Sequence, residues 1–300
     1  MGRFATKRFA LFMGVVVTFC LVVALSVVLL YKPAPTAPTL ELISNDNTVE
    51  ASTNIVSNGA NLATVTGGSY SNSGTTYTAT PDSNYVLGYW SLGSASGVKY
   101  ATDLSVTSSS AIVPTMIAKS SLTYVSTAAQ LTSALSSNAN IVLTQDIIAT
   151  SGFTPAGTYS GVLDGAGYSI TVNVSGTTAN VGGVCQTLTG VIKNLEIRGY
   201  VKNTSATASY NVGAFAGTIN GGLVSRCENH SVVSSAGGIA GGIVGAGYAS
   251  TRASTIYYCY NYGAITGASV GAVIYTNGTE SAPYVNLVSN YNAGALKTIA

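Results

Sequence analysis

The chain repeats a short pattern about every 30 residues, from roughly residue 180 to its C-terminus. Each copy has a run of glycine and small apolar residues, then a polar turn, then a short strand-like segment. Glycines align at Gly182, Gly213, Gly242 and Gly271, with spacings of 31, 29 and 29 residues. A near-constant period of this length is the sequence signature of a stacked solenoid, in which each repeat contacts only its neighbours. The pattern therefore predicts a stiff scaffold that presents an extended surface.

The strand-like segments that follow the glycine runs align on a second set of residues. They read VIKNLEIRGYV, LVSRCENHSVV, IYYCYNYGAIT and LVSNYNAGAL, and the aligned positions are Asn194, Cys227, Cys259 and Asn290. In this alignment Glu196 lies two residues after its reference position, whereas Glu228 lies only one residue after. Because side chains alternate between the two faces of a strand, a one-residue offset sends these two carboxylates to opposite faces.

A short amphipathic segment and several strand-like runs precede the repeats. We expect a helix from Ala128 to Ser136, because two leucines four residues apart share one face and Thr127 or Ser126 can cap its N-terminus. The runs IVLTQDII and YSGVLDGAGYSITVNV follow it. This order resembles the opening of pectate-lyase-like and adhesin solenoids. The resemblance implies a mainly β fold, a right-handed single-stranded parallel β-helix over 122–300, with the helix capping its first coil.

The segment GGIVGAG followed by IYYCYNYGAITG is the most characteristic stretch of the repeats. It resembles the GLUG motif of bacterial surface proteins, and the likeness extends over roughly 180–296. It implies a bacterial cell-surface, adhesin-like protein. Asn residues on successive coils can form hydrogen-bonded ladders, and we expect Gly263 and Gly294 to supply positive φ at a corner. Three residues of the first full copy depart from the motif: Glu228, His230 and Ser231.

Residues 39–118 form a separate β-rich unit in which short alternating runs are bounded by turn residues. Within it, TYTATPDSNYVLGYWSL has a turn opened by Pro81 and Asp82. Its aromatic residues, including Trp90, supply apolar area to a small core. The segment resembles the small β repeats of bacterial surface proteins, including the internalin-type B-repeat, although Asn84 replaces a Gly of that pattern.

The N-terminal region holds 23 consecutive residues without a charge, and basic residues flank them on both sides. An α-helix needs about 20 apolar residues to cross a bilayer, and a signal-peptide core is shorter. We therefore expect 1–32 to be a cytoplasmic tail and an uncleaved signal-anchor that spans a bacterial cell membrane once, at 9–31. The rest would be extracellular, beginning with a Pro-rich stalk at 33–38. A long cleaved signal is the alternative.

Charged residues make up only 7% of the chain, against roughly 25% in an ordinary globular protein. Four of the 12 Lys and Arg residues flank the N-terminal apolar run, so 8 basic residues face 10 acidic ones in the rest. The rest of the chain has no excess of basic residues that could bind nucleic acid, and we exclude that class of partner. A surface of hydroxyl and amide groups suits an exported β protein.

Cys227 and Cys259 occupy the same place in consecutive repeats. Stacked coils lie about 4.8 Å apart, within the Cα separation that a disulfide accepts. Either these residues form a disulfide, or they form a ladder of buried thiols, since free Cys is among the most buried residue types. The close spacing of zinc-binding cysteines is absent from the sequence, so no metal site is expected.

Carboxylates that could support catalysis are few in the solenoid region: Asp146, Asp164, Glu196, Glu228 and Glu280. Glycoside hydrolysis needs two carboxylates on one face, roughly 5–9 Å apart, and the offset of Glu196 and Glu228 argues against such a pair. Asp146 and Asp164 follow strands and are expected to form turns. We therefore expect no catalytic residue and no cofactor. Convergence of both glutamates with Arg226 in one groove would favour an enzyme instead.

One aromatic cluster stands out in the third repeat, where strand alternation puts Tyr258, Tyr260 and Tyr262 on one side. If they point outward, with Tyr291 one coil along, they form a stacking platform for a sugar or a partner protein. The alternative is a tyrosine ladder that only shields the flank of the solenoid.

Together these features predict a non-catalytic bacterial cell-surface protein that presents a β-helical rod for adhesion, with a glycan or protein on a host or neighbouring cell as ligand. One alternative is a β-helix protein that binds or degrades polysaccharides. The other is the N-terminal fragment of a longer surface protein, because the sequence ends within a repeat.

Overall fold

The computed structural model describes residues 61–206, 210–247, 253–275 and 285–299, which are mainly β. The predicted membrane span at 9–31, the stalk at 33–38 and the beginning of the β-rich unit lie outside these ranges. Among the described residues, no helix has the length and apolar character needed to cross a membrane.

The N-terminal part of the described chain is a small antiparallel β domain with two sheets. One sheet contains β1 (Asn61–Val65), β2 (Gly68–Ser73), β3 (Thr76–Pro81) and β6 (Ser105–Thr107), and the other contains β4 (Tyr85–Leu92), β5 (Lys99–Ala101) and β7 (Ile112–Ala118). Trp90 is fully buried between them and meets the edges of Tyr70 and Tyr77. Its indole N–H donates to the carbonyl of Asp103 at 2.7 Å. Trp90 shares this core with other buried apolar residues, such as Leu87, Val106 and Ile112.

A short helix precedes the first full coil, as the sequence predicts. After the 3-10 turn η1 (Lys119–Ser121) and strand β8 (Leu122–Val125), helix α2 covers Ala128–Ser136. The hydroxyl of Thr127 accepts from the backbone N–H of Gln130, which caps the helix. Leu131 and Leu135 are fully buried in the same apolar cluster as the solenoid interior, so the predicted cap is confirmed.

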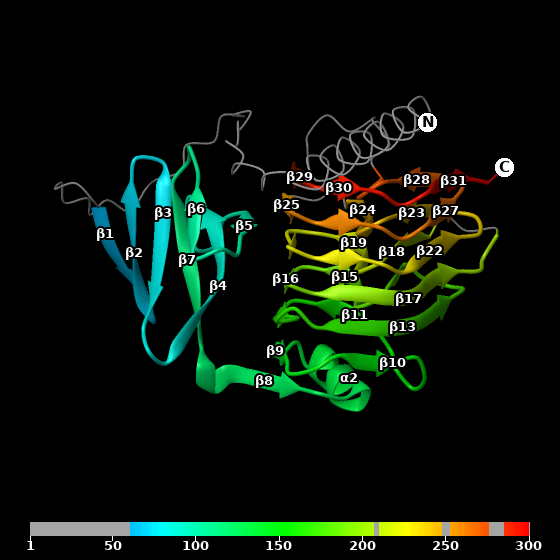
Figure 1. The fold of residues 1–300 in the computed structure, drawn as a ribbon, viewed down its shortest axis with the longest axis horizontal. Coiled ribbons are helices and arrows are strands. Elements are labelled where there is room, and N and C mark those ends of the chain that lie inside the picture. The colour runs from blue at the N-terminus through cyan, green and yellow to red at the C-terminus, as the bar shows by residue number, and fades with distance from the viewer. Residues whose placement is uncertain (1–60, 207–209, 248–252, 276–284, 300) are drawn as a thin grey trace, which may run out of the picture. The chain divides into compact units, whose positions relative to one another are not determined.

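The rest of the chain is a parallel β-solenoid, in which the strands of each turn stack on those of the turn before (Figure 1). A seven-stranded sheet contains β8, β9 (Asn140–Leu143), β12 (Val162–Asp164), β16 (Val191–Lys193), β20 (Leu223–Ser225), β25 (Ser254–Tyr257) and β29 (Val285–Val288). Two further sheets have four strands each. One contains β11 (Ala156–Tyr159), β15 (Cys185–Leu188), β19 (Ala216–Ile219) and β24 (Val244–Gly247). The other contains β14 (Val181–Gly182), β18 (Asn211–Gly213), β23 (Ile239–Gly241) and β28 (Ser269–Gly271).

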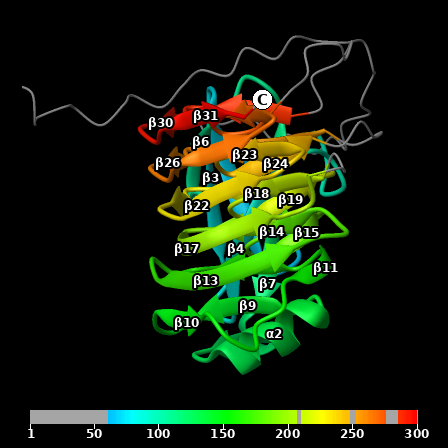
Figure 2. The ribbon, with the colours of Figure 1, turned by 90° about the vertical axis from the view of Figure 1, so that its right-hand side faces the viewer.

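The remaining solenoid sheet has nine strands, and several of them can be followed one above the next in Figure 2. They are β10 (Ile147–Ala149), β13 (Ser169–Gly176), β17 (Glu196–Asn203), β21 (Glu228–Asn229), β22 (Val232–Ser235), β26 (Tyr260–Asn261), β27 (Ile265–Gly267), β30 (Tyr291–Asn292) and β31 (Leu296–Thr298).

From β12 onward, a left-handed residue marks the corner between the seven-stranded and nine-stranded sheets in each described turn. The corner residues have φ near +50° and are Ala166, Asn194, Arg226, Tyr258 and Ser289. Asn194 therefore matches Arg226, and the alignment of Asn194 with Cys227 is wrong by one residue. A similar slip affects the glycine runs, because Gly213 pairs with Gly241 and not with Gly242.

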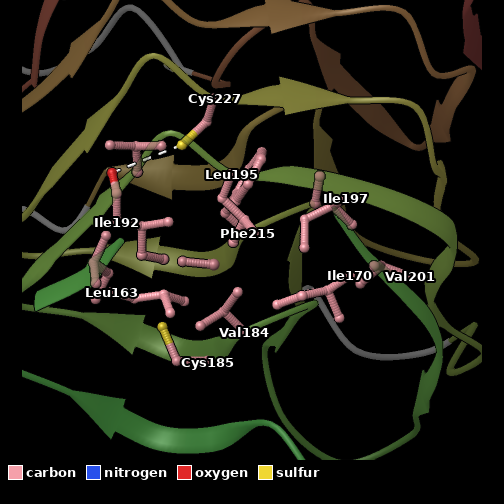
Figure 3. Packing of buried hydrophobic residues seen from close by; sticks show 14 of the residues in the cluster. Leu163, Ile170, Val184, Cys185, Ile192, Leu195, Ile197, Val201, Phe215 and Cys227 are labelled. Atoms are coloured by element: carbon pink, nitrogen blue, oxygen red, sulfur yellow. Dashed lines mark hydrogen bonds between the residues drawn. The ribbon is translucent and has the colours of Figure 1, made fainter. Parts of the chain in front are cut away.

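The solenoid interior is a continuous apolar stack (Figure 3). Phe215 is fully buried, as are Cys185, Cys227 and Cys259. All three cysteines are free thiols in the structure, so Cys227 and Cys259 do not form a disulfide. The thiol of Cys227 donates to the carbonyl of Ile192 in the turn before. Burial raises the pKa of Cys185 well above its ordinary value, and the same cause acts on Cys227.

Three asparagines form the hydrogen-bonded ladder that stacked repeats allow. Asn229 Nδ2 donates to Asn261 Oδ1 at 2.7 Å, and Asn261 Nδ2 donates to Asn292 Oδ1 at 2.6 Å. Gly263 and Gly294 lie beside this ladder, but neither has positive φ, contrary to the sequence prediction. A Cβ at Gly263 would lie 1.8 Å from the carbonyl oxygen of Ser231. These glycines therefore allow close stacking and do not turn a corner.

The outer face of the seven-stranded sheet is covered by the small β domain. Tyr100 of β5 meets Tyr257 of β25 at a ring-centroid distance of 6.1 Å, within one apolar cluster. Lys193 of β16 is only 7% exposed, and its Nζ donates to the carbonyl of Leu87 at 2.9 Å. This side of the solenoid is closed to ligands, whereas the outer face of the nine-stranded sheet carries exposed side chains.

Candidate functional site

Seven polar and aromatic side chains gather on the outer face of the nine-stranded sheet. We call this set the Tyr–Glu face; it consists of Glu196, Arg198, Glu228, His230, Tyr260, Tyr262 and Tyr291. Glu196, Glu228, Tyr260 and Tyr291 are register partners on four successive strands. Arg198, His230 and Tyr262 each lie two residues further along their segments, so they form a second column beside the first.

Strand alternation explains why these side chains face outward. In β17, Ile197 is fully buried in the solenoid interior, and Glu196 and Arg198 lie on either side of it. The same holds one turn later, where the buried Asn229 separates Glu228 from His230. Each inward residue anchors its strand, and its two neighbours are thereby directed to the surface.

Two carboxylates and two basic side chains converge in the middle of the Tyr–Glu face. Nε of Arg198 lies 2.7 Å from a carboxylate oxygen of Glu196. Nε2 of His230 lies 3.1 Å from a carboxylate oxygen of Glu228 and 3.7 Å from one of Glu196. The expectation that the two glutamates lie on opposite faces is therefore wrong, since they are direct register partners. The error follows from the one-residue misalignment of Asn194.

The tyrosines extend the same surface towards the last turn. Tyr260 meets Tyr291 and Tyr262 at ring-centroid distances of 6.3 Å each, and the rings of Tyr260 and Tyr262 are nearly parallel. The ring of His230 stacks on Tyr262 at 4.7 Å. Tyr262 and Tyr291 remain 43% and 50% exposed. Three of the four predicted tyrosines thus form an outward aromatic surface.

Tyr258 does not join this surface. It is a left-handed corner residue with φ of +51°, which breaks the strand alternation on which its predicted position depends. It is 8% exposed and lies 4.6 Å from the ring of Tyr257, in the apolar cluster shared with the β domain. The guanidinium of Arg226 lies over its ring.

The electrostatic environment of the Tyr–Glu face is acidic. Burial, followed by the negative charge of Glu228, raises the pKa of Tyr262 above its ordinary value. At the start of the sheet, hydrogen bonds from the backbone N–H and hydroxyl of Ser169 lower the pKa of Asp146, and the charge of Arg198 acts in the same direction. The charge of Arg198 therefore acts on the carboxylates of both Glu196 and Asp146.

Arg226 takes no part in the Tyr–Glu face. Its Nη2 donates to the carboxylate of Asp103 in the β domain at 2.9 Å. Glu196 and Glu228 therefore converge with Arg198 and His230, and not with Arg226, which was the convergence expected to favour an enzyme. Asp164 accepts from the backbone N–H of Ala166, as expected of a turn residue.

The remaining features give no separate site. In the described part of the chain, no group of three or more His, Cys, Asp or Glu residues could hold a metal ion. A hollow at the far end of β13 is lined by residues such as Thr154, Ser175 and Gln186, and no carboxylate or basic group contributes to it. The Tyr–Glu face is therefore the best candidate for recognition among the described residues.

Comparison with known proteins adds little. No family model and no curated protein matches the sequence. Among solved structures, a proposed immunoglobulin A1 protease from Bacteroides ovatus is similar, with 17% sequence identity and a TM-score of 0.41. The match covers 58% of this chain and 76% of that one. At these values the likeness carries no argument about function, and the solenoid assignment rests on the strand register described above.

Proposed function

We propose that this protein is a non-catalytic bacterial cell-surface protein whose β-solenoid binds a ligand through the Tyr–Glu face and so mediates adhesion. The observation that supports it is the register of four outward side chains on successive turns, which joins an exposed aromatic surface to a cluster of charged groups. Exposed aromatic rings with polar groups beside them are typical of recognition surfaces.

The solenoid scaffold suits this role. Its interior is held by apolar stacking and by the buried Asn ladder, so the outer side chains are held at fixed spacings. Such preorganisation limits the conformational entropy that is lost on binding. The proposal includes a membrane anchor at 9–31 and a right-handed coil; the apolar N-terminal run supports the first, and the resemblance to pectate-lyase-like and GLUG-type surface proteins supports the second.

An enzyme that degrades polysaccharides is the second candidate, and one observation favours it. Glu196 and Glu228 are register partners on neighbouring strands, which lie about 4.8 Å apart. Retaining glycosidases hold their two carboxyl groups about 5–5.5 Å apart. Against this, Glu196 is paired with Arg198 and Glu228 with His230, so neither carboxylate is placed as a proton donor. We therefore favour binding without cleavage.

A binding assay on the full chain in mild detergent distinguishes the two candidates. The protein is presented to glycan arrays and to whole cells, alongside a Tyr262→Ala/Tyr291→Ala variant. Tyr124→Ala is the matched control, because Tyr124 is 58% exposed but lies on β8, away from the Tyr–Glu face. Binding lost only in the double variant supports the proposal. Release of new reducing ends that stops in Glu228→Gln would replace it with the enzyme.

A further inference from the structure

The charges of the Tyr–Glu face limit the ligands that it can accept. Glu196, Glu228 and the neighbouring Asp146 carry three negative charges, and Arg198 is already engaged with Glu196. The next cation along β17 is Lys202, which lies over the ring of Tyr200. Lys202 is six residues from Glu196, roughly 20 Å along the strand. A ligand over the two glutamates and the tyrosines therefore meets net negative charge.

The available chemical groups match those of an uncharged sugar. Tyr262 and Tyr291 are exposed, so the part of each ring that other side chains leave uncovered can contact the C–H side of a sugar ring. The carboxylate of Glu228 is about half exposed, at 48%, and can accept from sugar hydroxyls in charge-assisted hydrogen bonds. An acidic sugar, by contrast, would bring its carboxylate close to those of Glu196 and Glu228, where like charges repel each other.

The register also gives the ligand a direction. Tyr291, Tyr260, Glu228 and Glu196 follow one another on successive turns, in a line parallel to the solenoid axis. Neighbouring turns are about 4.8 Å apart, a length comparable with one ring of an extended glycan. A glycan that lies along this line can place one ring over each turn, with its first rings on tyrosine and its later rings beside glutamate.

From these observations we propose that the ligand is a neutral glycan, free of uronic acids, that runs along the solenoid axis across about four turns of the Tyr–Glu face. This inference rests on the proposed function, because it names the ligand class of the same surface. Sugars are favoured over a protein partner because tyrosine rings and carboxylate acceptors lie on successive turns in two adjacent columns.

The test compares neutral and acidic oligosaccharides of equal length on the full chain. Cellohexaose and mannohexaose are the neutral probes, and hexagalacturonate is the acidic one, each titrated by isothermal calorimetry. We expect a neutral probe to bind at least about tenfold more tightly than the acidic one, a difference of about 1.4 kcal/mol. We expect the affinity to rise with chain length up to about four sugars and then to level off.

Variants connect this binding to the Tyr–Glu face. Tyr262→Ala and Tyr291→Ala should each weaken neutral-glycan binding several-fold, while Tyr124→Ala leaves it unchanged. Both residues are exposed, and circular dichroism checks that the variants remain folded. Glu196→Gln/Glu228→Gln should reduce the discrimination against hexagalacturonate, because the repulsion is removed.

The possible failures can be told apart. If hexagalacturonate binds as tightly as the neutral probes and this binding needs Tyr262, the ligand class is wrong and the proposed function stands. If cells or a protein bind through Tyr262 and Tyr291 while no glycan does, the ligand class is again overturned. If no glycan, protein or cell binds, both the inference and the proposed function fail.

Discussion

Replacing Asn261 with Ala tests whether the buried ladder holds the solenoid together. Asn261 is fully buried, and its side chain makes three hydrogen bonds. The substitution leaves Asn229 Nδ2 and the carbonyl of Gly263 without these partners in the interior. Each buried polar group left unpaired costs about 1–3 kcal/mol. We therefore expect Asn261→Ala to lower the free energy of unfolding by about 2–6 kcal/mol.

Asn292→Ala is the matched control, since Asn292 is the last residue of the same ladder and is only partly buried. When Asn292 is removed, Asn261 Nδ2 keeps its hydrogen bond to the carbonyl of Gly263, so we expect a loss of about 1 kcal/mol. Urea unfolding followed by far-ultraviolet circular dichroism and by the fluorescence of Trp90 gives both values. If Asn261→Ala costs no more than Asn292→Ala, the ladder does not stabilise the solenoid in the way described.

Three further predictions concern the interface, acid stability and the thiols. Lys193→Ala should lower the free energy of unfolding by about 1–3 kcal/mol in urea melts, because it leaves the buried carbonyl of Leu87 without its donor and removes the ion pair with the partly exposed Asp164; no measurable loss would contradict this. The lowered pKa of Asp146 in the folded state stabilises the fold above its unfolded pKa of about 3.9, and this contribution is lost as the pH falls through the folded value. Asp146→Asn should therefore make stability less dependent on pH in acid melts, and an unchanged slope would count against the bond to Ser169. The chain has a fourth cysteine, Cys20, in the N-terminal apolar run, and a Cys20→Ser variant leaves only the three buried thiols. In this variant the thiols should react with Ellman's reagent at pH 8 only after unfolding, and rapid reaction of the native protein would show that they are accessible.

Much of the architecture could be predicted from the sequence, because packing residues repeat. The period, the solenoid and the helix at Ala128–Ser136 follow from glycine runs, apolar spacing and a capping threonine, which are local signals. The small β domain follows from alternating runs and turn residues in the same way. These features need only short-range rules.

The centre of the site could not be predicted, because its register depends on a corner that has no sequence signal. Asn194, Arg226 and Tyr258 share a left-handed conformation although their side chains have little in common. Aligning Asn194 with Cys227 moved Glu196 by one residue, which separated it from Glu228. The same left-handed corner buries Tyr258, which strand alternation alone would place on the outer face.

Contacts between segments far apart in the chain could not be predicted from the sequence either. Arg226 pairs with Asp103, which is 123 residues away, because the β domain covers the seven-stranded sheet. No spacing in the chain predicts which solenoid face a preceding domain covers. This contact decides which face stays available, since it removes Arg226 from the candidate site.

Hydroxyl-radical footprinting of the full chain with and without a neutral hexasaccharide tests most directly whether the Tyr–Glu face binds the ligand. It reads the solvent exposure of individual tyrosine side chains. We predict that Tyr262 and Tyr291, both well exposed in the free protein, become protected while Tyr124 reacts as before. Saturating ligand that leaves Tyr262 and Tyr291 as reactive as in the free protein would contradict the account.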